Sequence, residues 1–186
     1  RAETNPVGKN NDYDAKRYAG VLELVKEKSK WSSPAAGVNR GVSAYFCHNS
    51  YVAEVVDVVL KDSKPVIEKV VAAVDCGIVV NRDSAINMGE GAIVDGIGNA
   101  LFGELTFKDG VPNKNNFHQY RMIRQQDSPK AIEVHFVDSK EDPTGLGEPY
   151  FPPVFAALAN SLYKATGKRF YQQPFGPQLE KDGFKV

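Results

Sequence analysis

The sequence predicts an α+β domain in which a mixed sheet packs with helices in two layers. Three observations support this prediction: β-rich runs follow one another in the first half, amphipathic helical patterns flank them, and a short hairpin pattern interrupts the second half. Length and composition agree, because 186 residues with 42% hydrophobic and 25% charged side chains suit one globular domain, or two small halves that share a core.

The first half of the chain predicts one helix and three strands. Residues 14–30 repeat apolar side chains at helical spacing, and Trp31 is expected to fix the end of this helix to the core. The β-rich runs follow at 41–47, 51–60 and 66–75, and a turn between the last two predicts a hairpin. Both faces of the 51–60 run are apolar, so we expect a central strand that is covered on each side.

A glycine-rich helix is expected over residues 83–103. Beside its apolar stripe runs a stripe of small residues at helical spacing, namely Gly89, Ala92, Gly96, Ala100 and Gly103. Each interior glycine costs about 1 kcal/mol relative to alanine, so close contact with another body must offset the penalty. The pattern favours packing against the sheet and leaves a planar ligand as the alternative.

The second half predicts four further elements. A hairpin is expected at 105–111, followed by an ordered connection over 113–127. The run 132–137 alternates apolar and polar side chains, which is typical of a strand with one wet face. The strongest helical pattern spans 152–166, with two prolines at its start and a glycine after its end.

Charge, hydropathy and cysteine content exclude several classes of protein. Basic and acidic residues both number 23, so no overall field recruits nucleic acid or an anionic membrane surface. No apolar run approaches the ~18 residues of a membrane span. Cys47 and Cys76 are too few for a disulfide framework or an iron–sulfur cluster, and we expect free, buried thiols. His48 and His118 lie in predicted turns without partner ligands at the required spacing, so no protein-ligated metal is expected.

The beginning of the chain differs from the rest. Residues 1–13 carry no periodicity and are predicted to be a linker that leads into a domain over 14–186. The sequence begins Arg1-Ala2-Glu3 without an initiator methionine or a leader pattern, so we expect a piece cut from something longer.

One carboxylate stands in an unusual local sequence, Thr144-Gly145-Leu146-Gly147-Glu148-Pro149, directly before the predicted helix at 152–166. The two glycines permit a sharp turn and close approach to a ligand, and Pro149 is expected to keep Glu148 extended. The helix that follows is expected to supply free backbone N–H groups. A carboxylate held for function and one that only complements the helix dipole both fit this pattern.

Five motifs follow one another along the chain: Asp75-Cys76-Gly77 with Asn81, Glu90-Gly91, Asn116-Phe117-His118-Gln119-Tyr120, Gly145-Leu146-Gly147-Glu148-Pro149, and Ala165-Thr166-Gly167-Lys168-Arg169. In order and spacing they resemble the C-terminal part of the molybdopterin-binding large subunit of the xanthine dehydrogenase/aldehyde oxidase family. Isoquinoline 1-oxidoreductase beta subunit-like proteins resemble the chain most among its members. The resemblance extends from residue 18 to residue 174.

The resemblance implies a bacterial oxidoreductase, a molybdenum hydroxylase that oxidises an aldehyde or an N-heteroaromatic substrate with water as the oxygen source. In that role Glu148 is the catalytic general base. The implied contacts to the molybdopterin cofactor are Gly145, Gly147, Met88, Gly89 and Gly91. The resemblance also makes the pterin as strong a candidate as the sheet for the small face of the glycine-rich helix.

The same resemblance implies that the chain is a fragment, inactive in isolation, that supplies the base and part of the cofactor wall. The upstream part of the same large subunit would complete the site, and the cofactor is expected in the full-length subunit and not in this fragment. Expected partners are an iron–sulfur small subunit, in some relatives a cytochrome c, and a small aldehyde or N-heterocycle. The expected location is periplasmic or membrane-associated through the full-length protein, with a cytoplasmic location as the alternative.

A second hypothesis comes from a different class of function. The chain would then be a non-catalytic α+β binding or assembly module with a degenerate cofactor site. Two departures from the family pattern support it: Met88, a weak acceptor, stands where many relatives carry a glutamine able to hydrogen-bond the pterin, and Arg82 stands where they usually carry proline. Retention of Glu148 in its Gly-x-Gly-x-Pro setting favours the catalytic hypothesis, because a decayed site has no need of a fixed carboxylate.

Overall fold

The computed structural model describes residues 13–186, and its centre is a four-stranded mixed sheet in the order β1-β2-β3-β6. The first three strands are antiparallel, and β6 runs parallel to β3. Their bounds are Asn39–Cys47 for β1, Ser50–Lys61 for β2, Lys64–Asp75 for β3 and Ile132–Phe136 for β6. The predicted α+β class with a mixed sheet is confirmed. The predicted linker over 1–13 lies outside the described residues, apart from Tyr13.

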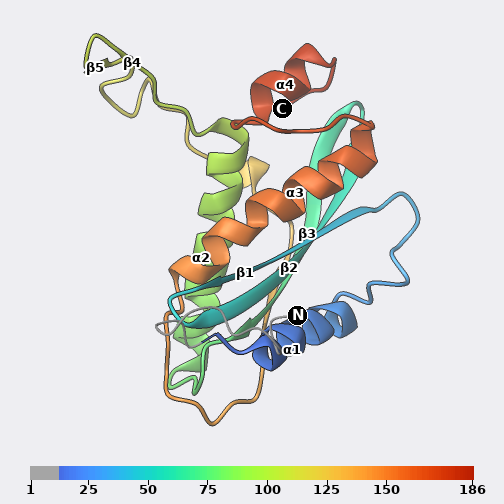
Figure 1. Cartoon of the computed structure of the whole chain (residues 1–186). Helices are drawn as coiled ribbons and strands as arrows, with labels where there is room; N and C mark the ends of the chain where they lie inside the picture. The colour runs from blue at the N-terminus through green and yellow to red at the C-terminus, as the bar shows by residue number, and fades with distance from the viewer. Residues whose placement is uncertain (1–12) are drawn as a thin grey trace.

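Helices cover both faces of the sheet (Figure 1). α2 (Arg82–Phe102) and α3 (Phe151–Thr166) pack on one face. α1 (Ala15–Lys28) covers the opposite face, where Val21 and Val25 lie against β2 and β3. The predicted position of β2 is confirmed, because it lies between β1 and β3 and its residues 50–58 are all buried.

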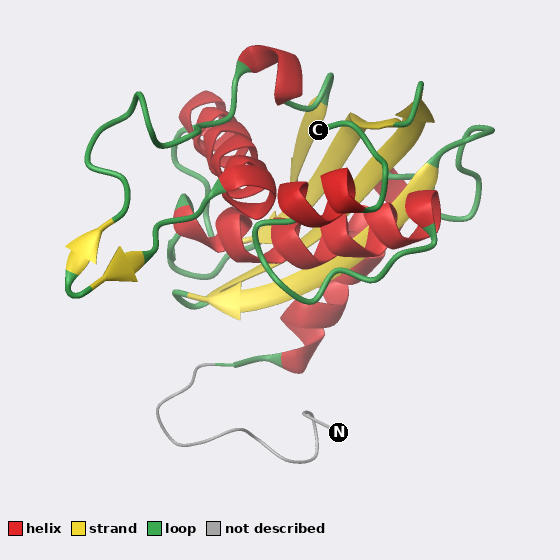
Figure 2. Cartoon of the chain, turned by 90° about the horizontal axis from the view of Figure 1, so that it is seen from above, coloured by secondary structure: helices red, strands yellow, loops and turns green. Residues whose placement is uncertain are grey.

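The remaining elements lie around this core (Figures 1 and 2). β4 (Phe107–Lys108) and β5 (Val111–Pro112) form the predicted hairpin, which stands away from the body of the domain in both views. The connection after it contains one 3-10 turn, η1 (Gln125–Asp127), and the chain closes with the short helix α4 (Gly176–Lys181). α3 ends at Gly167, whose φ of 72° is the left-handed conformation that glycine adopts without strain.

The small face of α2 packs mainly on α3. A Cβ added at Gly96 would lie 2.5 Å from a methyl carbon of Val154, which belongs to α3. One at Gly89 would lie 3.1 Å from the ring of Tyr150 and 3.2 Å from Val134 of β6. Of the contacts at these two glycines, only the one with Val134 involves the sheet, so the prediction that this face packs on the sheet holds at Gly89 and not at Gly96. The glycines let two helices approach closely at their crossing, which offsets their cost in the helix interior.

The two cysteines lie in different environments. Both cysteines are free, with Cys76 buried as predicted and Cys47 only half-buried. Burial raises the pKa of both thiols.

Across residues 13–186, no group of three or more His, Cys, Asp or Glu side chains gathers as a metal site would need. None of the described helices has the length and apolar character that crossing a bilayer requires.

Candidate functional site

Glu148 stands at the point where an irregular loop becomes α3. It is the first residue of a 3-10 turn, η2 (Glu148–Tyr150), which runs directly into the first turn of α3. Its neighbours Pro149 and Tyr150 are buried, whereas 70% of the Glu148 side chain is exposed. The carboxylate thus projects from a turn whose next two residues are anchored in the core.

The start of α3 departs from the predicted helix end with free backbone N–H groups. Pro149, Pro152 and Pro153 have no N–H, and the N–H of Phe151 donates to the carbonyl oxygen of Glu148. Few backbone donors are left for a ligand, so the predicted supply of free N–H groups is wrong here. The predicted extended conformation of Glu148 is wrong as well. The continuous turn into α3 outweighs the usual effect of a following proline.

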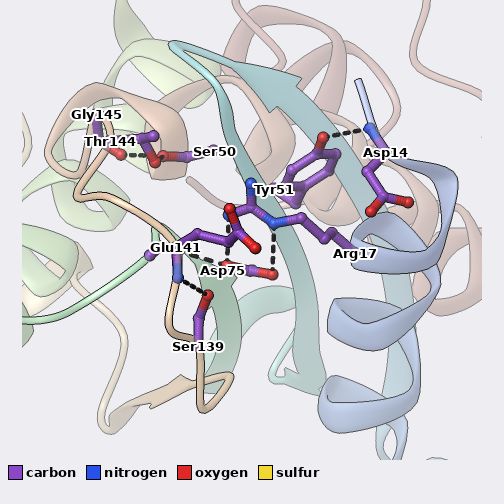
Figure 3. Close-up of polar contacts among 10 residues, drawn as sticks. Asp14, Arg17, Ser50, Tyr51, Asp75, Ser139, Glu141, Thr144 and Gly145 are labelled. Carbon is purple, nitrogen blue, oxygen red and sulfur yellow. Dashed lines mark hydrogen bonds and ion pairs between the residues drawn. The ribbon is translucent and has the colours of Figure 1, made fainter. Parts of the chain in front are cut away.

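The loop before Glu148 is fastened to the β1–β2 turn. The N–H of Gly145 donates to the carbonyl oxygen of His48 at 3.1 Å. Next to it, the hydroxyl of Ser50 lies 2.7 Å from that of Thr144 and also donates to the carbonyl oxygen of Gly145 (Figure 3). A Cβ at Gly145 would collide with the Cβ of His48, so only glycine allows this approach. These contacts hold the loop to the end of the β1–β2 hairpin.

A second fastening joins the same loop to the end of β3. The N–H of Thr144 donates to the carbonyl oxygen of Cys76 at 2.9 Å, and the N–H of Ile78 donates to that of Glu141 at 3.0 Å. The segment that follows β3 therefore runs beside residues 141–144 and braces them. Gly77, in the middle of this segment, adopts a φ of 72° that favours glycine.

An ion pair between α1 and β3 supports this end of the sheet (Figure 3). The guanidinium of Arg17 binds the buried carboxylate of Asp75 through two hydrogen bonds, of 2.9 and 2.7 Å. These bonds, with smaller contributions from the charges of Asp75, Tyr51 and Glu141, raise the pKa of Arg17. The guanidinium also lies 4.8 Å from the centre of the Tyr51 ring. The pair fixes α1 against the strand end from which the bracing segment leaves.

One side chain that the sequence did not connect with Glu148 lies beside it. The imidazole Nε2 of His48 is 3.0 Å from Glu148 Oε2, although the two residues are 100 positions apart. The sequence places His48 in a turn, as predicted, but carries no signal for its carboxylate partner. That partnership follows from the fastening of the loop to the β1–β2 turn.

The predicted cofactor contacts lie at different depths. Met88 is half exposed, and a Cβ at Gly147 would lie 2.9 Å from its terminal methyl group, so α2 and the Glu148 loop meet there. Gly91, one turn further along α2, is exposed and has nothing within 4 Å of its added Cβ. Gly89 is buried and already covered by Tyr150. Met88 thus lies beside the loop that carries Glu148, Gly91 lies on the exposed surface of α2, and Gly89 faces the protein interior.

Two unpaired polar groups lie beneath the turn that carries Glu148. Among the described residues, neither carboxyl oxygen of Glu54 has a hydrogen-bond partner, and neither does the hydroxyl of Tyr150. Burial raises the pKa of Glu54 well above its ordinary value, which favours the neutral acid in the folded chain. Burial, with contributions from Cys76 and Glu54, also raises the pKa of Tyr150. The sequence predicted neither group, because a glutamate in a strand usually faces solvent.

The fold is that of a cofactor-binding domain. Residues 13–129, more than half of the chain, match the family model described as molybdopterin cofactor-binding domain. The chain belongs to that family, as the resemblance implied.

Its relatives are named as dehydrogenases and oxidoreductases. The membrane-bound aldehyde dehydrogenase (pyrroloquinoline-quinone) of Gluconacetobacter polyoxogenes is 30% identical over 175 residues, which cover 88% of this chain and 22% of the relative. Isoquinoline 1-oxidoreductase subunit beta of Brevundimonas diminuta is 29% identical over 169 residues, again 88% of this chain and 22% of the relative. The chain therefore spans about a fifth of the length of these relatives.

Solved structures share the fold. Quinoline 2-oxidoreductase from Pseudomonas putida 86 superposes with a TM-score of 0.63 and 19% identity, over 71% of this chain and 18% of that one. The aldehyde oxidoreductase from Desulfovibrio gigas covers 84% of this chain and 19% of its own, with a TM-score of 0.56 and 19% identity. At these identities the likeness concerns the fold alone.

Proposed function

We propose that the protein carrying this chain is a molybdenum hydroxylase that oxidises an aldehyde or an N-heteroaromatic substrate, with water as the oxygen source and Glu148 as general base. The observation that carries the proposal is the exposed Glu148 carboxylate on a braced turn, in a loop that meets α2 at Met88, in a chain of the molybdopterin cofactor-binding family. The names of the relatives, an aldehyde dehydrogenase and an isoquinoline oxidoreductase, support the proposed substrate classes.

The exposed face fits one wall of a cofactor site. Met88 and Gly91 present a half-exposed thioether and a bare stretch of helix, where a flat group can approach without meeting a side chain. In the loop that meets Met88, Gly145 and Gly147 add no side chains that would fill this space. When bound, molybdopterin would supply the metal centre that takes up the two electrons of the oxidation. Gly89 would contribute through its place in the helix–helix contact, since Tyr150 already covers it.

Glu148 would hold and move one proton. An ionised carboxylate only accepts hydrogen bonds, so Glu148 can take the proton that the attacking oxygen atom of water must lose. Its Oε2 lies beside His48, and Oε1 has no hydrogen-bond partner within the described part of the chain. The buried Pro149 and Tyr150 fix the backbone from which the side chain projects. The remainder of the subunit would have to exclude water from this face.

The first experiment replaces Glu148 by glutamine in the full-length subunit with its cofactor. Glutamine keeps the size and the hydrogen-bonding reach but cannot take up a proton, so we expect turnover to fall by about 10²–10⁴-fold while molybdenum content is unchanged. Glu180→Gln is the matched control, because Glu180 is also exposed but lies on α4, which packs at the opposite end of α2. Near-normal turnover of Glu148→Gln would remove this residue from the mechanism.

A second experiment tests the cofactor wall. Gly91→Ala places a methyl group on the open face of α2, and Gly20→Ala places one on α1, where the added Cβ also meets nothing within 4 Å. We expect only Gly91→Ala to lower the molybdenum content per subunit. Extraction of the cofactor distinguishes molybdopterin from the pyrroloquinoline quinone named for one relative. A wild-type subunit that contains neither would favour the non-catalytic binding or assembly module.

The subunit's partners and location belong to the same proposal. We propose that the chain is inactive alone, that the rest of the large subunit completes the site, and that an iron–sulfur subunit, with a cytochrome c in some assemblies, removes the electrons. The name of one relative includes the word subunit, which supports assembly with other subunits, and that of another includes the word membrane-bound, which supports association with a membrane. Affinity purification from fractionated cells tests both points: a cytoplasmic subunit purified without an iron–sulfur partner would contradict them.

A further inference from the structure

The β1–β2 turn places His48 with little freedom. Cys47 pairs with Ser50 across the hairpin, which leaves His48 and Asn49 as a two-residue turn. Their φ angles are 51° and 59°, the left-handed pair that the tight type I′ turn requires. The direction of the His48 side chain is therefore set by the register of two strands.

The same turn meets the loop of the proposed base at two levels. At the backbone level, the carbonyl oxygen of His48 accepts the N–H of Gly145. At the side-chain level, His48 Nε2 lies 3.0 Å from Glu148 Oε2. The loop can move relative to the turn only by breaking both contacts, together with those of Ser50.

We propose that His48 is the positioning residue for Glu148. The imidazole donates its Nε2 hydrogen to Oε2 and so turns Oε1 toward the proposed cofactor site. This role of His48 rests on the proposed function of Glu148 as a base. Nε2 must carry the hydrogen in this contact, because an ionised carboxylate accepts only. A glutamate side chain has three rotatable bonds and is 70% exposed here, so without this partner the carboxylate samples many orientations. His48 contacts Glu148 and no reacting atom, so it acts only through the base.

The turn offers a pair of matched variants. His48→Asn suits the left-handed turn conformation at least as well as histidine, but its shorter side chain cannot reach Glu148. His48→Gln has an amide nitrogen at about the reach of Nε2 and keeps a donor for Oε2. Asn49→Gly is the control, because it changes the other residue of the same turn, which is exposed and does not hydrogen-bond Glu148.

The kinetic arm uses the full-length subunit with its cofactor, with benzaldehyde and quinoline as probe substrates and an artificial electron acceptor. We expect His48→Asn to lower kcat about tenfold with KM unchanged, the loss expected for one charge-assisted hydrogen bond, and His48→Gln to retain most of kcat. Asn49→Gly should match the wild type. An unchanged kcat in His48→Asn, an equal loss in both His48 variants, or a change in KM alone would overturn the proposal.

A second arm does not depend on turnover. Backbone hydrogen–deuterium exchange, read by mass spectrometry on the same subunit, should be faster over 145–150 in His48→Asn and unchanged in His48→Gln and Asn49→Gly. Equal exchange in all four proteins would overturn the proposal even if neither probe substrate reacts. Glu148→Gln separates the two proposals. If this variant stays active, the proposed function of Glu148 fails. If it is inactive while His48→Asn is fully active, only the role proposed for His48 is overturned.

Discussion

Glu54 is the group through which the stability of this fold should depend most clearly on pH. Its carboxyl lies in the sheet face that α2 and α3 cover, it is fully buried, and both its oxygens lack a hydrogen-bond partner within residues 13–186. Burial raises its pKa well above that of an exposed glutamate, so the folded chain holds a proton that the unfolded chain releases. Raising the pH therefore favours the unfolded state.

The size of the effect follows from this difference in bound protons. An exposed glutamate has a pKa of about 4.3, so above that pH the unfolded chain is ionised at this position. Each further pH unit then lowers the free energy of unfolding by about 1.4 kcal/mol, for as long as Glu54 keeps its proton in the folded chain. Glu54→Gln keeps the shape and the unpaired buried polar group but removes this pH dependence. The variant should thus gain about 1.4 kcal/mol relative to the wild type between pH 5 and pH 6.

Urea unfolding followed by the fluorescence of Trp31, the single tryptophan, measures this gain. Trp31 packs beside the α1 cluster of the core and reports its loss. Every other titrating group is shared by the two proteins, so the difference between them isolates position 54. Glu180→Gln, at an exposed site, should show no pH-dependent gain. If the difference in free energy of unfolding between the wild type and Glu54→Gln is the same at pH 5 and at pH 6, Glu54 does not hold a proton in the folded chain over this range.

Two further predictions concern packing and the ion pair. Gly96→Ala should lower the free energy of unfolding by about 1–3 kcal/mol, because the new methyl group collides with α3. Gly91→Ala, at an open position of the same helix, should raise it by up to ~1 kcal/mol. Equal effects of the two variants in urea unfolding would contradict the described helix crossing. Arg17→Met should cost about 3 kcal/mol because it leaves the Asp75 carboxylate buried without its cation, and adding Asp75→Leu should recover most of that loss; failure of the double variant to recover would show that the pair is not the cause.

The regular elements could be predicted because their signal is local. The helix expected over 152–166 is found at Phe151–Thr166, and the one expected over 83–103 at Arg82–Phe102. In both, apolar side chains recur at helical spacing and the ends carry proline, asparagine or glycine, so a short window of sequence suffices. The central position of β2 was predictable for the same reason, since both its faces are apolar.

The candidate site was predictable only in part. The Gly-x-Gly-Glu-Pro segment marked Glu148, but local rules gave its conformation wrongly, because the chain continues from Glu148 straight into α3. Nothing local indicates that Glu54, one polar residue in an apolar strand, is buried with no hydrogen-bond partner among residues 13–186. A strand pattern shows which residues share a face but not what covers that face.

The sequence by itself determined the class of fold, the order of the elements and the loop that carries the carboxylate, because spacing along the chain fixes which side chains share a face. Only the tertiary structure decided that His48 meets Glu148, that Arg17 holds Asp75 and that α3 packs against Gly96 of α2. Each of these contacts joins residues from two separate elements. Their pairing depends on strand register and helix crossing, which are set by the packing of the whole core.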